Sequence, residues 1–295
     1  MYLFQQKSFD KKKRTLIYFL VPITVYMLVF FLYPVLYNLF IGFFDLKLGG
    51  TAEFVGLDNY RKMAGDEQFL NSLITTMVFV FCAVSVELIF GLAIAGLLNS
   101  ENKKMEILRT FILIPTVFTP LVAGLVWKSL YHPDMGMVSY YLRALGINIG
   151  RGLIVERHLA LLSVIIVDVW EWTPLMVIIL LAGLKSLPKN PYEAAMIDGA
   201  GAVQLFFRIT VPLLKPTLLV ALLIRSLDAL KVFDIIWVIT GGGPGTSTTV
   251  ANLRIYEVGM NQLQVGYAAA LSNGLLVVGI IVGLIFVKFI YSKEG

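Results

Sequence analysis

The residues of this sequence that could do chemistry are charged side chains inside long apolar runs. They stand at Glu87, Asp168, Glu171, Arg225, Asp228, Lys231 and Asp234. A charge is costly in hydrocarbon, so such residues usually face the interior of a helix bundle and pair with one another or line a solute path. The sequence therefore allows two uses for them: ion pairs that fix helix packing, or a polar lining for a path through a membrane.

Spacing limits how the charges between 225 and 234 can act together. Residues three apart turn back by about 60° per step on a helix with 3.6 residues per turn. Arg225 and Asp234 then point to opposite faces, so the charges of this run cannot all line one pore. Neighbours can pair, Arg225 with Asp228 and Lys231 with Asp234. Counted from Pro216 at about 1.5 Å per residue, Arg225 lies roughly 14 Å into its span, near mid-depth.

The elements that must position these charges are membrane-spanning helices. Of the 295 residues, 58% are hydrophobic and only 15% are charged, far from the balance of a soluble domain. Runs of about 20 apolar residues can cross a bilayer, and these runs are continuous rather than alternating, which excludes a barrel of strands. We predict an all-α membrane protein with six transmembrane helices, at 16–44, 69–98, 107–130, 159–184, 217–239 and 267–291.

Composition excludes several kinds of chemistry. Cys82 is the only cysteine, and His132 and His158 are the only histidines, so a disulfide framework and a zinc centre are not expected. The glycine-rich stretch 241–248 has no G-x-x-x-x-G-K-[ST] pattern, so this chain should not hydrolyse ATP. We expect a turn there. The net charge of +5 is spread between apolar runs, which does not favour nucleic-acid binding.

Basic residues set the predicted topology. Lys and Arg are more numerous in the segments on the N-terminal side of the membrane, which include the run 11–14 and the connection 185–216. The positive-inside rule then places both ends, 1–15 and 292–295, and this connection in the cytoplasm, around a membrane domain at 16–291. Prolines at 22, 34, 115 and 120 are expected to kink the first and third spans.

The connection 185–216 holds the polar stretch NPYEAAMIDGAG, Asn190–Gly201. Asn190 as a cap, proline next and Glu193 three residues after the cap predict a short helix from Tyr192 to Asp198. Gly199 and Gly201 can end that helix, and a second helical stretch follows to Pro212. Physical reasoning leaves two roles open: docking of a partner protein on the thin alanine face, or an interfacial connector.

The same residues carry a resemblance to a known family. Glu193-Ala194-Ala195, Gly199 and then Ile209, Val211 and Pro212 resemble the EAA motif of ABC importer permeases, with Val211 where leucine is usual. Further similarity to the carbohydrate-uptake branch lies in the segments 54–60, 113–131, 183–201 and 238–249.

This resemblance implies the ABC importer permease fold, with a cytoplasmic coupling helix between the fourth and fifth spans. The residues expected to dock on an ATPase subunit are Glu193, Ala194, Ala195, Asp198 and Gly199. It also implies a second homologous permease subunit, two copies of the ATPase that bind ATP and Mg, and an extracytoplasmic solute-binding protein. The implied location is the plasma membrane of a bacterium or archaeon, and no cofactor is expected in this chain.

The resemblance also gives the intramembrane polar residues a candidate task. Aromatic faces stack on the C–H face of a sugar ring, and charged groups bond strongly to its hydroxyls. The candidate lining of a sugar path is Asp168, Trp170, Glu171, Trp172, Arg225, Asp228, Lys231 and Asn273. Residue types alone do not distinguish a neutral oligosaccharide from a glycerol phosphate. A second candidate contact, with the binding protein, is the connection Tyr131–His158, in which Met137–Leu145 is predicted to form a short amphipathic helix. That helix could equally lie at the membrane–water interface.

Two other functions would also use acidic side chains inside the membrane. An ion-coupled secondary transporter would also use mid-membrane carboxylates, but it predicts inverted repeats, and none is evident here. An intramembrane aspartyl protease could use Asp168 and Asp228, but the glycine-flanked aspartate typical of such enzymes is absent. We therefore expect a transport subunit rather than an enzyme, with secondary transport as the alternative.

Overall fold

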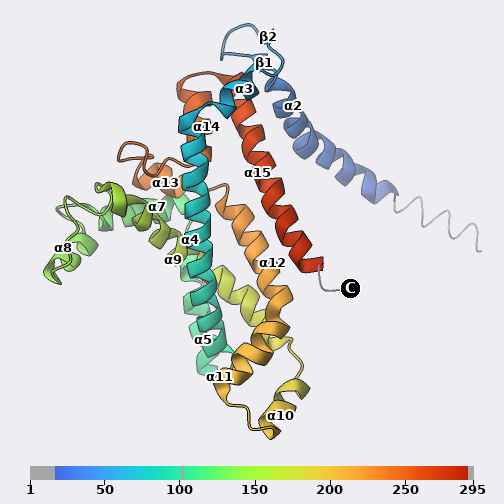
Figure 1. The fold of residues 1–295 in the computed structure, drawn as a ribbon, viewed down its shortest axis with the longest axis vertical. Helices are drawn as coiled ribbons and strands as arrows, with labels where there is room; N and C mark the ends of the chain where they lie inside the picture. The colour runs from blue at the N-terminus through green and yellow to red at the C-terminus, as the bar shows by residue number, and fades with distance from the viewer. Residues whose placement is uncertain (1–16, 101–102, 292–295) are drawn as a thin grey trace, which may run out of the picture. The chain divides into compact units, whose positions relative to one another are not determined.

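The structure is a computed structural model that describes residues 17–100 and 103–291 (Figure 1). The terminal segments predicted to be cytoplasmic, 1–15 and 292–295, lie outside the described residues. The described chain forms two compact units. Unit 1 comprises the described residues up to Asp66 together with Ile255–Gly274, and unit 2 comprises Glu67–Arg254 and the described residues from Leu275 onward.

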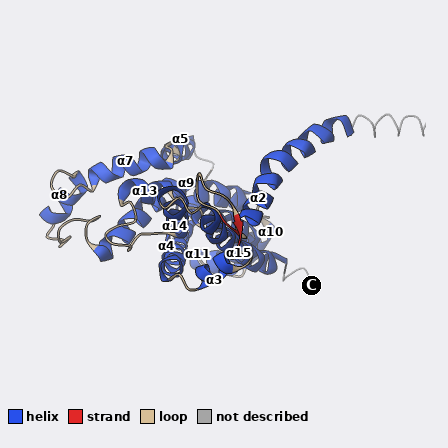
Figure 2. Cartoon of the chain, turned by 90° about the horizontal axis from the view of Figure 1, so that it is seen from above, coloured by secondary structure: helices blue, strands red, loops and turns tan. Residues whose placement is uncertain are grey.

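Membrane-spanning helices dominate the part of the chain that the structure describes. Five helices are long and apolar enough to cross a bilayer: Ile17–Ile41, Glu67–Leu98, Arg157–Lys185, Ala202–Ala229 and Val265–Ile290. A bent pair, Met105–Val117 and Pro120–Leu130, makes a sixth span if it is counted as one. The predicted all-α class with six spans is therefore confirmed, and Figure 2 shows helices and loops in all of the described chain except one small strand pair.

Unit 1 consists of the first span, a two-stranded sheet, two short helical segments and the beginning of the last span. Its elements in chain order are η1 (Leu28–Leu32), α2 (Tyr33–Ile41), β1 (Phe44–Asp45), β2 (Glu53–Phe54), α3 (Asp58–Ala64), η3 (Glu257–Asn261) and the beginning of α15 (Val265–Tyr291). The strands β1 and β2 are antiparallel, with Phe44 opposite Phe54. The side-chain amide of Asn59 donates to the carbonyls of Gly42 and Phe44, at 3.0 and 2.9 Å, and ties α3 to the end of α2.

Unit 2 holds the intramembrane charges. Its elements in chain order are α4 (Glu67–Leu98), α5 (Lys103–Ile112), α6 (Ile114–Val117), α7 (Pro120–Leu130), α8 (Met137–Ala144), α9 (Arg157–Lys185), α10 (Asn190–Ile197), α11 (Ala202–Leu205), η2 (Phe206–Thr210), α12 (Val211–Ala229), α13 (Asp234–Ile239) and α14 (Ala251–Tyr256), which runs into unit 1. In Figure 1, α10 and α11 lie at one end of the bundle formed by α4, α9 and α12, whereas α13 lies toward the other end.

Two prolines are accommodated by π-helical turns rather than by breaks. The turn η1 directly precedes the helix that contains Pro34, and η2 directly precedes the helix that contains Pro212. A proline lacks the N–H of the helical ladder, and its ring clashes with the carbonyl four residues earlier. A π turn shifts the bonding from i−4 to i−5, which relieves that clash and lets both helices continue.

The third predicted span does break at its prolines. The two halves, Met105–Val117 and Pro120–Leu130, meet at 90°. Phe118 and Thr119 between them have extended backbone, with ψ of 144° and 147°. Because the residue before a proline disfavours helical geometry, Thr119 cannot continue the helix into Pro120. The kink predicted for this span is confirmed.

The predicted fifth span, 217–239, is wrong at both ends. The helix begins at Ala202, because the stretch predicted to stop at Pro212 runs on through η2 into α12 as one span that ends at Ala229. It ends in 3₁₀-like turns, in which the amides of Lys231 and Val232 bond to the carbonyls of Asp228 and Ala229 at 2.9 and 3.1 Å. Such turns satisfy carbonyls that the helix leaves free, and α13 then starts as a separate helix.

Glycines allow the helices of unit 2 to pack closely. A Cβ at Gly91 on α4 would lie 2.6 Å from Cγ of Met176 on α9, and one at Gly183 on α9 would lie 2.7 Å from Cγ2 of Thr217 on α12. Small residues at a helix interface are what permit this approach in lipid, where packing rather than hydrophobic exclusion drives association.

We predict that Gly91→Val destabilises unit 2. The added methyl groups would overpack the α4–α9 contact against Met176, which is 2% exposed, at a cost of about 1–3 kcal/mol. The thermal unfolding temperature of the purified protein in detergent measures this. Gly96→Val is the matched control, since a Cβ there meets nothing within 4 Å. Equal unfolding temperatures for the two variants would contradict the prediction, and adding Met176→Ala should restore part of the loss.

Candidate functional site

The guanidinium of Arg225, on α12, is the centre of a buried charge cluster in unit 2. Its Nε and Nη2 donate to the two carboxylate oxygens of Glu87 at 2.8 and 3.0 Å, and Nη2 also donates to Asp168. Its Nη1 donates to Asp228 at 3.1 Å. All three guanidinium nitrogens are thus hydrogen-bonded to carboxylates, in the planar fork geometry that makes arginine suited to such pairing.

The four charges come from three different spans. Glu87 lies on α4, Asp168 on α9, and both Arg225 and Asp228 lie on α12. The side chains of Arg225, Glu87 and Asp168 are at most 3% exposed, whereas that of Asp228 is 44% exposed. The buried pairs hold three helices together, and Asp228 lies where the cluster meets open space.

Sequence reasoning found the Arg225–Asp228 pair, which is confirmed, but it did not assign a partner to Glu87. The signal was available, since an isolated carboxylate in the apolar run of α4 must find a cation elsewhere in the bundle. The other predicted pair is wrong: among the described residues, no ion pair joins Lys231 to Asp234. The helix ends between them, so they are no longer neighbours on one helical surface.

A cavity of about 170 Å³ opens beside the cluster. Its polar wall contains Asp168, Trp172, Arg225, Asp228, Lys231 and Asp234, and its remaining wall comes from Pro120 and the break after α12. The ring of Trp172 lies against the guanidinium of Arg225, 5.1 Å from its Cζ, in a cation–π contact. The tertiary fold thus brings Asp168, Trp172, Arg225, Asp228 and Lys231 of the predicted lining around one space.

Two predicted lining residues of α9 lie elsewhere in unit 2. Trp170 packs against Phe118 and Trp127, with ring centroids 6.1 and 5.6 Å apart, and does not border the cavity. Glu171 is 1% exposed, and its buried Oε2 has no hydrogen-bond partner among the described residues. Residues one apart on a helix point about 100° away from each other, so neighbours of Trp172 face other elements.

Asn273 belongs to unit 1 and is occupied by its own network. Its amide nitrogen donates to the hydroxyl of Tyr60 at 2.9 Å, and its carbonyl oxygen accepts from the amide of Asn38 at 2.7 Å. The residue is 5% exposed. These bonds tie α15 to α2 and α3 within unit 1, which is a packing role.

The polar stretch predicted as a short helix forms α10, Asn190–Ile197, followed by Gly199 in the left-handed region at φ +81°. The predicted cap is wrong: Lys189, not Asn190, occupies the cap position, and no side chain caps the helix. Because Asn190 already has a helical place, Glu193 is left without a reciprocal bond to the cap amide. Glu193, Ala194, Asp198 and Gly199 are exposed, and Ala195 is half-buried.

One hydrogen bond connects α10 to the helix that carries Arg225. The hydroxyl of Tyr192 donates to Oγ1 of Thr210 at 3.0 Å, and Thr210 is the last residue of η2. On the other side of the glycine turn, the side chain of Gln204 accepts from the amide of Gly201 at 3.2 Å and caps α11. The exposed helix is therefore bonded to η2 through Tyr192 and continues through the glycine turn into α11, and both of these elements run directly into α12.

The connections toward the opposite end of unit 2 agree with the predicted helix and turn. The amphipathic stretch forms α8, with Tyr140 and Tyr141 67% and 58% exposed. In the loop before α9, the backbone amide of Arg151 donates to Oε1 of Glu156 at 3.0 Å, and this bond lowers the pKa of the Glu156 carboxyl. The glycine-rich stretch is a turn, in which Gly241, Gly242 and Gly245 have positive φ.

A chain of this kind, with about six spans, an exposed polar helix in one connection and a charge cluster at the bundle centre, has the architecture of a membrane transport subunit. Residues 3–293 match the family of binding-protein-dependent transport system inner membrane components. The chain belongs to this family.

Individual relatives cover nearly all of the chain. The trehalose/maltose transport system permease protein MalF of Thermococcus litoralis is 37% identical over 94% of this chain and 92% of its own length. The sulfoquinovosyl glycerol transport system permease protein SmoG of Agrobacterium fabrum is 34% identical, over 93% and 90%. A chain of a bacterial alginate ABC transporter, solved in complex with a periplasmic protein bound to an alginate pentasaccharide, has the same fold, with a TM-score of 0.81, 23% identity and 94% coverage of both chains.

We predict that Arg225→Ala strongly destabilises the protein. The substitution leaves Glu87 and Asp168 buried without their cation, and breaking a buried pair in this way costs about 3–5 kcal/mol. Thermal unfolding in detergent measures the loss. Asp228→Asn is the matched control, because this partner is 44% exposed and an exposed pair contributes only about 0–1 kcal/mol. An equal loss in both variants would contradict the cluster as the packing centre.

Proposed function

We propose that this chain is one of two permease subunits of an ATP-driven ABC importer and forms half of the path for a sugar. The observation that carries the proposal is α10: an exposed helix with the Glu-Ala-Ala pattern, tethered through Tyr192 and Thr210 to the span that holds Arg225. The family, which depends on binding proteins, supports it. The trehalose/maltose relative supports a sugar as the solute.

This proposal also implies the other subunits of the importer. A pair of ATPase subunits would bind ATP and Mg and receive α10, a second permease would complete the path, and an extracytoplasmic binding protein would deliver the solute. The location is the plasma membrane, with α10 and both termini in the cytoplasm. The ion-coupled alternative gains no support, because the matching family and the named relatives are components and permeases of binding-protein-dependent or ABC transport systems.

Coupling would run from α10 into the spans. A displacement of α10 moves Tyr192, which pulls on η2 through Thr210. Because η2 and α12 form one continuous helix from Ala202 to Ala229, that displacement reaches Arg225 and the cavity without an intervening hinge. Rigid elements that move as units are the usual carriers of such transitions. Closure of the ATPase pair would in this way change the width of the cavity.

The charge around the cavity favours a neutral sugar over an anionic one. Arg225 is the cation of the buried wall, and each of its guanidinium nitrogens already donates a hydrogen bond to Glu87, Asp168 or Asp228. The groups left for a solute are the exposed carboxylates of Asp228 and Asp234, the ammonium of Lys231 and the ring of Trp172. Carboxylates accept hydroxyl hydrogen bonds and repel a phosphate or sulfonate, so a polyol fits this set better than an acid does.

The coupling role is tested by Glu193→Lys. Reversing the charge on the exposed face of α10 should cut ATP-driven uptake at least tenfold in vesicles that contain the complete importer. Membrane insertion and thermal stability should stay unchanged, because the side chain of Glu193 is exposed and makes no hydrogen bond or ion pair with the described residues. Glu106→Lys, the same reversal at an exposed position on α5, should transport normally. Normal coupled uptake by Glu193→Lys would refute the docking of α10.

The solute preference is tested by Asp228→Asn together with Asp234→Asn. Removing both exposed carboxylates should reduce the uptake of a neutral disaccharide several-fold while basal ATP hydrolysis persists. The readout is the KM and maximal rate of uptake in vesicles, with maltose or trehalose as the neutral solute and glycerol 3-phosphate as the anionic one. Faster wild-type uptake of glycerol phosphate than of either disaccharide would overturn the preference for neutral solutes.

A further inference from the structure

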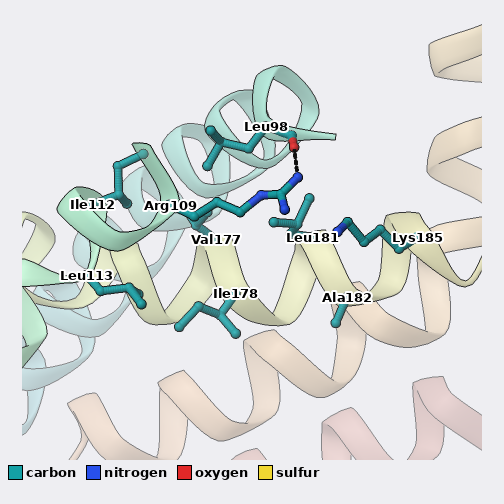
Figure 3. A pocket seen from close by; sticks show the side chains of 9 residues that line it. All are labelled: Leu98, Arg109, Ile112, Leu113, Val177, Ile178, Leu181, Ala182 and Lys185. Carbon is teal, nitrogen blue, oxygen red and sulfur yellow. Dashed lines mark hydrogen bonds between the residues drawn. The ribbon is translucent and has the colours of Figure 1, made fainter. Parts of the chain in front are cut away.

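A second cavity in unit 2, of about 360 Å³, lies between α5 and the last turns of α9 (Figure 3). One wall is a stripe of α9 made by Val177, Ile178, Leu181 and Ala182, and the other is made by Leu98, Ile112 and Leu113. These walls are aliphatic. The charge cluster of Arg225 does not border this cavity, so it is a separate site, which we call the α5–α9 groove.

Two cations stand at one end of the α5–α9 groove. Figure 3 shows the amino group of Lys185 pointing back along the groove in the direction of the guanidinium of Arg109. Nη2 of Arg109 donates to the carbonyls of Leu98 and Ser100, at 2.7 and 2.8 Å. Its Nε is buried without a partner, and neither cation takes part in an ion pair among the described residues. Two positive groups that face one space, with no described acid between them, favour an anion there.

The position of Arg109 and Lys185 along the spanning helices indicates what kind of anion fits between them. Leu98 is the last residue of α4, and Lys185 is the last residue of α9, so the cations stand where two spanning helices end. From Lys185 the aliphatic stripe runs back toward the middle of the span as far as Val177, about 12 Å at 1.5 Å per residue. A ligand that fills the groove must therefore carry a negative group at the membrane–water boundary and a hydrocarbon chain that enters the bilayer.

We propose that the α5–α9 groove binds one anionic phospholipid, with its phosphate between Arg109 and Lys185 and one acyl chain along α9. Basic pockets between spanning helices are known to hold anionic headgroups. Lysine and arginine stems can also pack along apolar surface while their charged ends reach the headgroup. A soluble phosphate would leave the aliphatic walls uncovered, and a neutral lipid would leave both cations without a counter-charge.

The lipid would act close to the element that meets the partner. Only Ser186–Lys189 separate the end of α9 at Lys185 from the first residue of α10. Holding Lys185 through a lipid phosphate would fix the last turn of α9, and with it the starting point of α10. The expected consequence is that anionic lipid supports transport and neutral lipid alone does not.

The proposal is tested by lipid binding to the full-length protein in detergent, measured by native mass spectrometry with phosphatidylglycerol and phosphatidylcholine of the same acyl chains. The wild type should bind phosphatidylglycerol about tenfold more tightly than phosphatidylcholine. The double variant Arg109→Gln, Lys185→Gln should lose that preference. The matched control Arg208→Gln, Lys215→Gln removes the same charge from η2 and α12 outside the groove and should keep it. Equal affinity of the wild type for both lipids, or equal loss in the control, would overturn the proposal.

Further measurements test whether another molecule occupies the groove and whether a variant fails only because it is misfolded. Ala182→Trp fills part of the groove and leaves both cations in the sequence, so it should weaken the binding of both lipids while the unfolding temperature stays the same. Inorganic phosphate should not displace phosphatidylglycerol, because it lacks the chain; displacement would indicate a simple anion site. The assembled importer in nanodiscs should retain one phosphatidylglycerol per copy of this chain. Its absence there would mean that a protein partner covers the groove, and the proposal would fail.

Discussion

The burial of one guanidinium among three carboxylates organises the centre of unit 2. Arg225 reaches α4 through Glu87 and α9 through Asp168, while Asp228 on its own helix accepts from the third guanidinium nitrogen, Nη1. In hydrocarbon none of these groups can stand alone, so the three spans are constrained to one relative rotation and one depth. The aliphatic contacts between the same helices have no such directional demand, because lipid chains are as apolar as the side chains they would replace.

The cluster also explains why one side of the cavity wall is buried and ion-paired and the other is open. Its buried members are at most 3% exposed, whereas Asp228, Lys231 and Asp234 are the charged side chains of the cavity wall that are open to solvent. The break after Ala229 produces this arrangement, since an unbroken helix would have carried Lys231 and Asp234 on around its surface. A polar site in the membrane is tolerated where irregular backbone borders a cavity rather than lipid, which is the situation at residues 230–233.

At the far end of unit 2 the same helix is not broken: it is continuous from Ala202 to Ala229. A π turn at η2 absorbs the proline that would otherwise separate an interfacial helix from the span. A single hydrogen bond, from Tyr192 to Thr210, therefore links the exposed helix α10 to the continuous helix that reaches the charge cluster. Local backbone geometry, rather than a long chain of side-chain contacts, joins the exposed helix that we propose docks on a partner to the polar centre of unit 2.

The sequence by itself determined the number of spans, the class of fold, the short helix in the connection 185–216 and the pairing of Arg225 with Asp228. These depend on hydrophobic length and on residues three or four positions apart, which are local properties. The tertiary structure decided which spans meet. It selected Glu87 as a partner of Arg225 across 138 residues, placed Asn273 in a hydrogen-bond network of unit 1, turned Trp170 away from the cavity and ended α12 at Ala229. Each of these depends on which faces of distant helices come together, and periodicity along one helix contains no information about its neighbours.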